Sequence, residues 1–327
     1  MSRHKPEVFD FIVNRRGGTV MRNGEEKIRE EIVSHFGART GSFTFVAGDE
    51  VKEAVRAWVR DNAGSNRCLV IGGGDGTVMS AVEEAMGRDD VMLGILPLGT
   101  QNFVARQLGF AADFKKAAAQ YKGGHGATMD VGEVNGLHFL VGMTLDDNSL
   151  NYFRAREKMR DDEKMSALRK AFTAAAGVLG RNSNTFTVYS EEHKQGKKIE
   201  GRIVAITNNS VDPVPVHPLP YNIRSYRDAL MQVMGRRKRA GKLSLYVFKG
   251  GLIGAPAMLP DVLRGTWDKN PAIEKETAKE FVVAASENGH QGDVAEKSIV
   301  LDGEIKKVQY PLKVRILRHA VRVFKPK

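Results

Sequence analysis

The sequence has a single cysteine, Cys68, among its 327 residues. One cysteine cannot form an intramolecular disulfide bond or a zinc site built from cysteines, so both kinds of scaffold are excluded. No apolar run approaches the roughly 18 residues that a membrane-spanning helix needs. The N-terminus has a basic start but no apolar segment of signal-peptide length. A reducing cytoplasm is therefore the expected compartment.

Acidic residues are the minority among the charged ones. The chain has 50 lysines and arginines against 39 aspartates and glutamates, a formal net charge of +11. This excess suits an anionic partner such as a nucleotide, nucleic acid or an acidic membrane surface. Nucleic acid is disfavoured, because the basic stretches lack interleaved aromatics and no helix-turn-helix, zinc or RNA-binding motif is present. The hydrophobic content of 42% excludes global disorder.

The first third of the chain alternates short apolar runs with helical periodicity. We predict strands at 9–14, 43–46, 68–71 and 91–96, and helices over about 25–36, 51–59 and 78–86. Asp49 is expected to cap the second of these helices. Strands that alternate with helices of this length predict a largely parallel sheet with right-handed crossovers.

The pattern changes near residue 127. Two strand-like runs flank an Asn135-Gly136 turn. Further strands are expected at 185–190, 202–207, 243–248, 281–285, 297–301 and 313–317, with a charged helix over about 152–179 and a loop over 208–227. Because most of these strands are separated by turns, they predict a second, mainly antiparallel β domain.

Three glycine-rich turns each follow a predicted strand, at 14–18, 72–77 and 99–102. Because the carboxyl ends of parallel strands share one edge of a sheet, the turns should meet there. Glycine lets backbone N–H groups approach a phosphate, and the helix that follows Thr77 adds positive potential at its N-terminus. Neither a P-loop nor a GxGxxG dinucleotide fingerprint is present.

Asp75 lies within the second turn and places a negative charge beside the expected phosphates. It is compatible with them if it binds a metal, holds a water on a metal, or orients the glycine loop. One such turn is more often a plain strand-to-helix connection, but three at equivalent strand ends favour phosphate binding.

These turns resemble the diacylglycerol kinase catalytic-domain family, which includes soluble bacterial lipid kinases and the sphingosine and ceramide kinases. The resemblance is carried by GGGDGTVMSAVEEAM (72–86) and LGILPLGTQNFVARQLG (93–109). IVNRRGG near the start and IVLDGEIKKVQYPLKVRILRHAVRVFKPK at the end agree with it. The GGDG element is shared more loosely with NAD kinases and phosphofructokinases, whereas the Gly-Thr-x-Asn element followed by Ala-Arg is typical of the lipid-kinase branch.

The resemblance implies an ATP-dependent lipid kinase that transfers the γ-phosphate to a lipid hydroxyl, diacylglycerol-like or sphingoid-like, with Mg²⁺ as cofactor. It implies a Rossmann-like, parallel-sheet α/β domain that binds ATP, over residues 1–127 plus about 312–327. It also implies a β-sandwich lipid-substrate domain over residues 128–311, with the active site in the interdomain cleft.

Carried over residue by residue, the resemblance places the nucleotide against the three turns. The residues implied to line it are Asn14, Gly17, Gly73, Gly74, Asp75, Gly76, Thr77, Gly99, Thr100 and Asn102. Asp75 is also a candidate catalytic residue and, with Asp130, a candidate metal ligand. Asp302 and Glu304 match the family's Asp-Gly-Glu.

Asp302 is the candidate general base for the lipid hydroxyl, and Glu304 would lie beside the nucleotide or its magnesium. Without the family context, Asp302-Gly303 is interpreted as a simple hairpin turn. Two positions depart from the family pattern. Phe103 replaces an acidic residue after the third-loop asparagine, and Ala240 replaces the aspartate of Asp-Gly-x-Leu, which some bacterial members use in a structural magnesium site.

Two alternative functions stay open. One is an NAD kinase-like enzyme of the same superfamily, and the other is a catalytically weak regulator that binds nucleotide or anionic membrane. The basic stretch 224–242 is either a membrane-docking surface or a solvated loop. We expect a cytoplasmic protein in peripheral contact with the inner membrane face, and a sandwich edge could support a homodimer.

Overall fold

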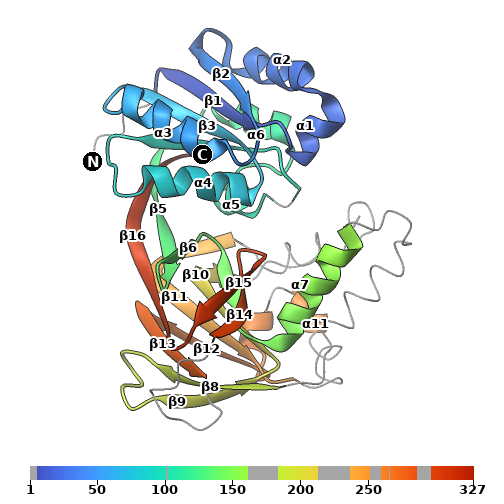
Figure 1. Ribbon diagram of the computed structural model, residues 1–327, viewed down its shortest axis with the longest axis vertical. Helices are drawn as coiled ribbons and strands as arrows, with labels where there is room; N and C mark the ends of the chain where they lie inside the picture. The colour runs from blue at the N-terminus through green and yellow to red at the C-terminus, as the bar shows by residue number, and fades with distance from the viewer. Residues whose placement is uncertain are drawn as a thin grey trace. The chain divides into compact units, whose positions relative to one another are not determined.

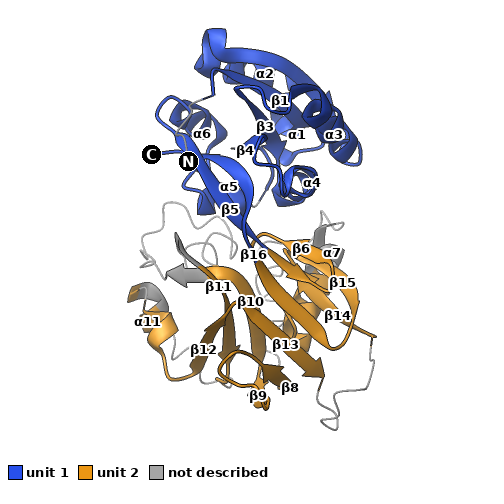
Figure 2. Ribbon diagram, turned by 90° about the vertical axis from the view of Figure 1, so that its left-hand side faces the viewer, with its two compact units in different colours: residues 1–131, 317–327 blue, residues 132–316 orange. Residues whose placement is uncertain are grey.

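A computed structural model describes residues 6–100, 102–160, 183–212, 236–250, 259–264, 266–285 and 296–327. It divides into two compact units, shown in Figures 1 and 2: unit 1 comprises Met1–Val131 and Leu317–Lys327, and unit 2 comprises Gly132–Ile316. The chain passes between the units within two strands, β5 (His125–Val134) and β16 (Leu312–Lys325). The domain boundaries expected from the sequence are 127/128 and about 311/312.

Unit 1 contains a parallel sheet, as the alternating strand and helix pattern predicts. Its strand order is β2-β1-β3-β4-β16, and every neighbouring pair is parallel. The strands are β2 (Thr40–Val46), β1 (Val8–Asn14), β3 (Arg67–Gly73), β4 (Met92–Pro97) and the C-terminal part of β16. The strand order reverses between β1 and β3, and such a switch is where ligands bind in sheets of this type.

Helices of unit 1 pack on both faces of the sheet, because successive side chains of β1 point to opposite faces. Phe9 packs edge-on against Phe36 at the end of α2, whereas Asp10, which points to the other face, accepts a hydrogen bond from Trp58 of α3. The helices are α1 (Gly18–Asn23), α2 (Glu25–Phe36), α3 (Val51–Asn62), α4 (Asp75–Ala85), α5 (Phe103–Gln107) and α6 (Phe114–Gln120), with a 3-10 turn at Gly37–Arg39.

The expected cap at Asp49 is wrong. The residue that precedes α3 is Glu50, and its side chain makes no capping bond within the helix. Its carboxylate instead accepts the backbone N–H of Ala47 at 2.8 Å. The turn before the helix is therefore stabilised by a longer acid one position further along the chain.

Unit 2 contains two antiparallel sheets over one apolar core. The six-stranded sheet has the order β12 (Ile273–Ala278), β11 (Arg236–Phe248), β10 (Ile203–Asp212), β7 (Gly142–Thr144), β14 (Glu296–Leu301) and β15 (Glu304–Gln309). The second has the N-terminal part of β16, then β13 (Glu280–Ala285), β8 (Asn184–Tyr189) and β9 (Lys197–Gly201), and β6 (Leu137–Phe139) joins through β5.

The core of unit 2 is shared by side chains from both sheets. Ile206 and Leu243 of the first sheet and Phe281 and Val314 of the second belong to the same buried cluster. This arrangement confirms the β-sandwich prediction. Helices α7 (Asp147–Arg160) and α11 (Leu259–Arg264) and a 3-10 turn at Trp267–Lys269 complete the unit.

Some expected elements have different bounds. Residues 208–212, expected in a loop, continue strand β10, and β16 extends to Lys325 rather than ending at 317. The remainder of that loop, 213–227, and the helix beyond Arg160 lie outside the described residues. None of the described helices combines the length and apolarity that crossing a bilayer requires.

Candidate active site

The three predicted turns follow β1, β3 and β4, which are neighbouring parallel strands of unit 1. Their backbones are joined by hydrogen bonds. The Gly99 N–H donates to the Gly73 carbonyl at 3.0 Å, and the Thr19 N–H donates to the Leu98 carbonyl at 3.0 Å. The structure therefore brings the three turns together at one edge of the sheet.

Glycine is required where the second and third turns cross. A Cβ at Gly99 would lie 2.2 Å from the Gly74 Cα and 2.7 Å from its nitrogen. A Cβ at Gly73 would lie 2.6 Å from the Thr77 side chain. The backbones leave no room for side chains here, which is the property that a phosphate-binding turn needs.

Asn14 and Thr77 connect the first and second turns. The Asn14 amide donates to the Thr77 hydroxyl at 2.9 Å, and its Oδ1 accepts the Arg16 N–H at 2.9 Å. Thr77 lies in the first turn of α4 and is 9% exposed. These bonds fix the start of α4, whose N-terminus carries the positive end of the helix dipole.

Asn102 closes the third turn on itself. Its backbone is left-handed, with φ of 54°, and its side chain pairs with both the N–H and the carbonyl of Gly99 at 3.0 Å. Thr100 of the same turn and Gly76 of the second turn are exposed. The predicted nucleotide residues thus combine a rigid backbone with accessible surface.

Gly17 belongs to the same edge, because a Cβ there would lie 3.0 Å from the Asn14 carbonyl oxygen and 3.1 Å from that of Leu98. From the sequence we interpret Gly17 and Gly18 as part of a turn. The structure instead starts the short helix α1 at Gly18.

Asp75 orients the third turn. Its Oδ1 accepts the backbone N–H of Val104 at 2.9 Å, at the start of α5. Burial raises the pKa of Asp75, while backbone N–H groups of residues 102–104 act in the opposite direction. Of the three roles considered from the sequence, this contact corresponds to the orientation of a glycine loop.

The predicted metal ligands do not form a cluster in the described part of the chain. Asp130 is 2% exposed, and its Oδ1 accepts the His319 N–H at 2.8 Å. The described residues contain one group of three close metal-capable side chains, Glu192, His193 and Glu276 in unit 2, and neither Asp75 nor Asp130 belongs to it. Magnesium ligation by Asp75 and Asp130 stays a prediction.

Asp302 lies in a two-residue hairpin between β14 and β15, with φ of 47° followed by 88° at Gly303. The residue is half-buried. Its carboxylate accepts the backbone N–H groups of Leu140, Val141 and Gly142 at 2.6, 2.8 and 2.9 Å. The residue is therefore both a hairpin turn and an anchor for a distant segment.

Glu304 lies two residues further along, with a side chain that is 63% exposed and paired with Lys306 at 2.8 Å. Both carboxylates belong to unit 2, whereas every predicted nucleotide residue belongs to unit 1. Their joint action in one site stays a prediction.

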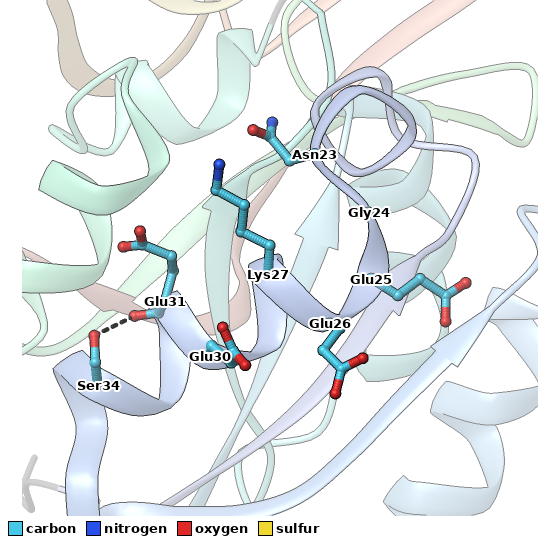
Figure 3. A pocket seen from close by; sticks show the side chains of 8 residues that line it. All are labelled: Asn23, Gly24, Glu25, Glu26, Lys27, Glu30, Glu31 and Ser34. Carbon is cyan, nitrogen blue, oxygen red and sulfur yellow. Dashed lines mark hydrogen bonds between the residues drawn. The ribbon is translucent and has the colours of Figure 1, made fainter.

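A hollow on the surface of unit 1 lies elsewhere, where α1 meets α2 (Figure 3). It is lined by Asn23, Gly24, Glu25, Glu26, Lys27, Glu30, Glu31 and Ser34. Four glutamates against one lysine repel phosphate, and none of the predicted nucleotide residues lines it. It is not a candidate for the nucleotide.

The sequence analysis missed a buried pair of amides, Asn208 and Asn209 in β10, which are 0% and 3% exposed. The sequence feature that could have identified this pair is two consecutive asparagines within the apolar run of a strand. Asn208 pairs with Leu243 in the middle of β11, the strand that contains Ala240.

Comparison with known proteins gives a family match and related sequences. Residues 9–134 match the family model described as the diacylglycerol kinase catalytic domain. A diacylglycerol kinase of Bacillus subtilis is 35% identical over 99 residues, covering 30% of this chain and 31% of that relative. One of Staphylococcus carnosus is 33% identical over 97 residues, covering 29% and 30%. These matches span about a third of the relatives' length.

The fold comparison covers both units. A crystal structure of a diacylglycerol kinase from Bacillus anthracis matches with a TM-score of 0.66 at 19% identity, covering 98% of this chain and 97% of that one. At this identity the match shows the fold: a parallel α/β unit joined to an antiparallel β unit.

Proposed function

The chain belongs to the diacylglycerol kinase catalytic-domain family, whose domain it carries over residues 9–134, and from this membership we propose that it is an ATP-dependent lipid kinase. The observation that carries the proposal is the crossing of Gly74 and Gly99 at the edge of the parallel sheet, where a Cβ would fill the space. Two glycine turns in such contact present backbone N–H groups rather than side chains to a polyphosphate.

In this proposal the ATP phosphates lie over the second and third turns. The N-terminus of α4, an eleven-residue helix, and the Thr77 hydroxyl supply positive potential and a hydrogen bond. Asp75 and Asp130 are the candidate protein ligands of Mg²⁺, which would supply positive charge against the developing charge on the phosphates.

The acceptor is a lipid hydroxyl, diacylglycerol-like or sphingoid-like. Its oxygen forms a bond to the γ-phosphorus as the bond from that phosphorus to the β,γ-bridging oxygen breaks, and ADP leaves with the electron pair. Asp302 takes the hydroxyl proton in this scheme, and Glu304 lies beside the nucleotide or its magnesium. An ionised carboxylate has about four acceptor positions, and three backbone N–H groups already point at that of Asp302.

Those three bonds also favour a second candidate, a catalytically weak regulator that binds nucleotide. Three N–H groups occupy most of the acceptor positions of the carboxylate, so few remain for a lipid hydroxyl. The regulator and the lipid kinase both bind ATP, but only the kinase transfers phosphate. An NAD kinase-like activity would instead show transfer to NAD without a lipid.

The experiment is phosphate transfer from γ-labelled ATP with Mg²⁺, in mixed micelles of a total lipid extract. The wild-type protein should label a lipid, and Asp302→Asn should not. Tight ATP binding with no labelled lipid would favour the regulator. Labelled NAD, in a parallel assay with NAD as the acceptor, would favour the NAD kinase-like activity. Vesicles with and without anionic lipid, added to the same assay, test the proposed peripheral contact with an anionic membrane.

A further inference from the structure

Three consecutive backbone N–H groups point at one carboxylate in unit 2. Leu140 and Val141 form the bend between β6 and β7, Gly142 begins β7, and Asp302 accepts from all three. Successive N–H groups pointing the same way make a concave anion-binding arrangement. The Asp302 N–H in turn donates to the Gly142 carbonyl at 2.9 Å. The position of Asp302 therefore depends on how this bend is held.

Asn208 holds the same bend from the other side. Its backbone N–H donates to the Val141 carbonyl at 3.1 Å, and its side-chain Nδ2 donates to the Leu140 carbonyl at 3.3 Å. The peptide group between Leu140 and Val141 is thus gripped at its oxygen by Asn208 and at its N–H by Asp302. Because a peptide group is planar, fixing one end fixes the other.

The next peptide group is held in the same way. Its oxygen, on Val141, accepts from Asn208, and its N–H, on Gly142, donates to Asp302. A Cβ on Gly142 would lie 2.8 Å from the Ile206 carbonyl oxygen, so the bend is also packed closely against β10. Asn208 and the Asp302 carboxylate therefore hold the same two successive peptide groups, Asn208 at their oxygens and Asp302 at their N–H groups.

Asn209 fixes the side chain of Asn208. Its Nδ2 donates to the Asn208 Oδ1 at 3.0 Å, and its own Oδ1 accepts the Gly241 N–H at 3.0 Å. Asn209 has a left-handed backbone, with φ of 67°, where the register of β10 with β11 shifts. The Thr207 hydroxyl donates to its carbonyl at 2.8 Å. The chain of bonds thus runs from β11 to Asp302.

Two buried amides are expensive in an apolar sandwich unless their hydrogen bonds are made. Fully bonded buried networks specify one arrangement of the groups they connect, and each bond polarises the next. Here the connected groups end at a carboxylate, whereas Ile206 and Leu243, buried in the same two strands, are apolar.

We propose that Asn208 and Asn209 are positioning residues for Asp302, acting through the peptide groups of residues 140–142. This inference rests on the proposed function, because the position of Asp302 affects turnover only in an enzyme that uses it. The chain of bonds lies wholly within unit 2, so its loss should leave nucleotide binding in unit 1 unchanged.

The first measurement is amide hydrogen exchange at residues 140–142 in Asn208→Leu. The matched control is Asn148→Leu, because Asn148 is also buried, at 2% exposure, and bonds a backbone carbonyl, that of Arg202, at 2.7 Å. Asn208→Leu should accelerate exchange at 140–142 on the order of tenfold beyond the control. If Asn208→Leu does not fold, Asn208→Asp keeps the shape and loses the Nδ2 donor.

The second measurement is steady-state lipid phosphorylation by the same variants. Asn208→Leu should lower kcat on the order of 10- to 100-fold with KM for ATP unchanged. A fall in kcat without a change in KM for ATP separates a positioning role from a general loss of stability. The control variant should keep the wild-type kcat per folded molecule.

Unchanged exchange at 140–142 overturns the inference, whatever the activity. Accelerated exchange with a kcat equal to that of the control also overturns it. Accelerated exchange in a protein whose wild type phosphorylates no lipid overturns the proposed function and, with it, the positioning role. Accelerated exchange together with the fall in kcat at an unchanged KM for ATP supports the inference.

Discussion

Gly99 crosses Gly74 so closely that a Cβ on Gly99 would lie 2.2 Å from the Gly74 Cα. Real Cβ atoms do not approach a backbone atom this closely, so Gly99→Ala must separate the second and third turns. We expect ATP affinity to fall on the order of 100-fold, because the phosphate-binding N–H groups lose their common orientation. Calorimetric titration with ATP measures the loss.

The control for this variant is Gly123→Ala. A Cβ on Gly123 would meet only the flexible Lys327 side chain, at 3.7 Å. Gly123→Ala should keep wild-type ATP affinity and folding. If Gly99→Ala binds ATP as tightly as this control, the two turns do not form the nucleotide site.

Asp75→Asn distinguishes loop orientation from metal ligation. The Asn Oδ1 can still accept the Val104 N–H, whereas Asp75→Ala removes the acceptor. If Asp75 orients the third turn, Asp75→Asn keeps ATP binding and Asp75→Ala weakens it by about tenfold, the equivalent of one hydrogen bond of about 1.4 kcal/mol. Loss of Mg²⁺-dependent turnover in Asp75→Asn with intact ATP binding would instead indicate a metal role.

The raised pKa of Asp75 predicts a pH dependence. Burial raises this pKa in the folded state above its ordinary value of 3.8, so the folded protein binds the proton more firmly than the unfolded chain. The stability that protonated Asp75 contributes is complete below 3.8 and is lost as the pH rises through the higher folded pKa. Urea unfolding should show wild type losing stability relative to Asp75→Asn over that interval, and parallel curves would contradict the burial of this carboxyl.

Asp10 predicts a pH dependence of stability with the opposite sign. Burial acts to raise its pKa, but hydrogen bonds from Arg67, Ser42 and Trp58 outweigh burial and lower the pKa below 3.8. The stability from this group is therefore present above pH 3.8 and lost as the pH falls through the lower folded pKa. Asp10→Asn should cost about 3 kcal/mol of unfolding free energy at pH 7, since it removes a buried carboxylate from its pair with the partly exposed Arg67.

Asp61→Asn is the control for Asp10→Asn. Asp61 also pairs with an arginine, Arg60 at 2.8 Å, but the side chains are 59% and 75% exposed. Exposed pairs contribute little, so this variant should unfold like wild type. Equal urea midpoints for the two variants would show that the Asp10 pair does not stabilise unit 1.

Thr77→Val tests the bond between the first and second turns. It keeps the shape of the side chain and removes the hydroxyl that accepts the Asn14 amide at 2.9 Å. We expect weaker ATP binding, on the order of tenfold for one hydrogen bond, with the affinity restored in Thr77→Ser. Equal affinity of Thr77→Val and wild type would remove this hydroxyl from the nucleotide site.

Sequence alone predicted the parallel sheet because its evidence is local. Strands β1, β3 and β4 are continuous apolar runs, and each is followed at once by a glycine turn. The topology of parallel strands then places those turns at one edge without any knowledge of side-chain contacts.

The surroundings of Asp302 could not be predicted in the same way. The residue bonds a bend about 160 positions away, and that bend is held by Asn208 through backbone groups that no local pattern identifies. The role of Asp75 was also undetermined, because its partner, the N–H of Val104, belongs to another turn. The full length of β16 could have been predicted from the sequence, however, since apolar and basic residues alternate over much of 312–325.

The most direct test of the account is the mass of the lipids after incubation of a total lipid extract with ATP and Mg²⁺. Wild type and Gly123→Ala should each add one phosphate to the same lipid, and Gly99→Ala should add none. A wild-type protein that binds ATP at the glycine turns but leaves every lipid mass unchanged would contradict the assignment of a lipid kinase.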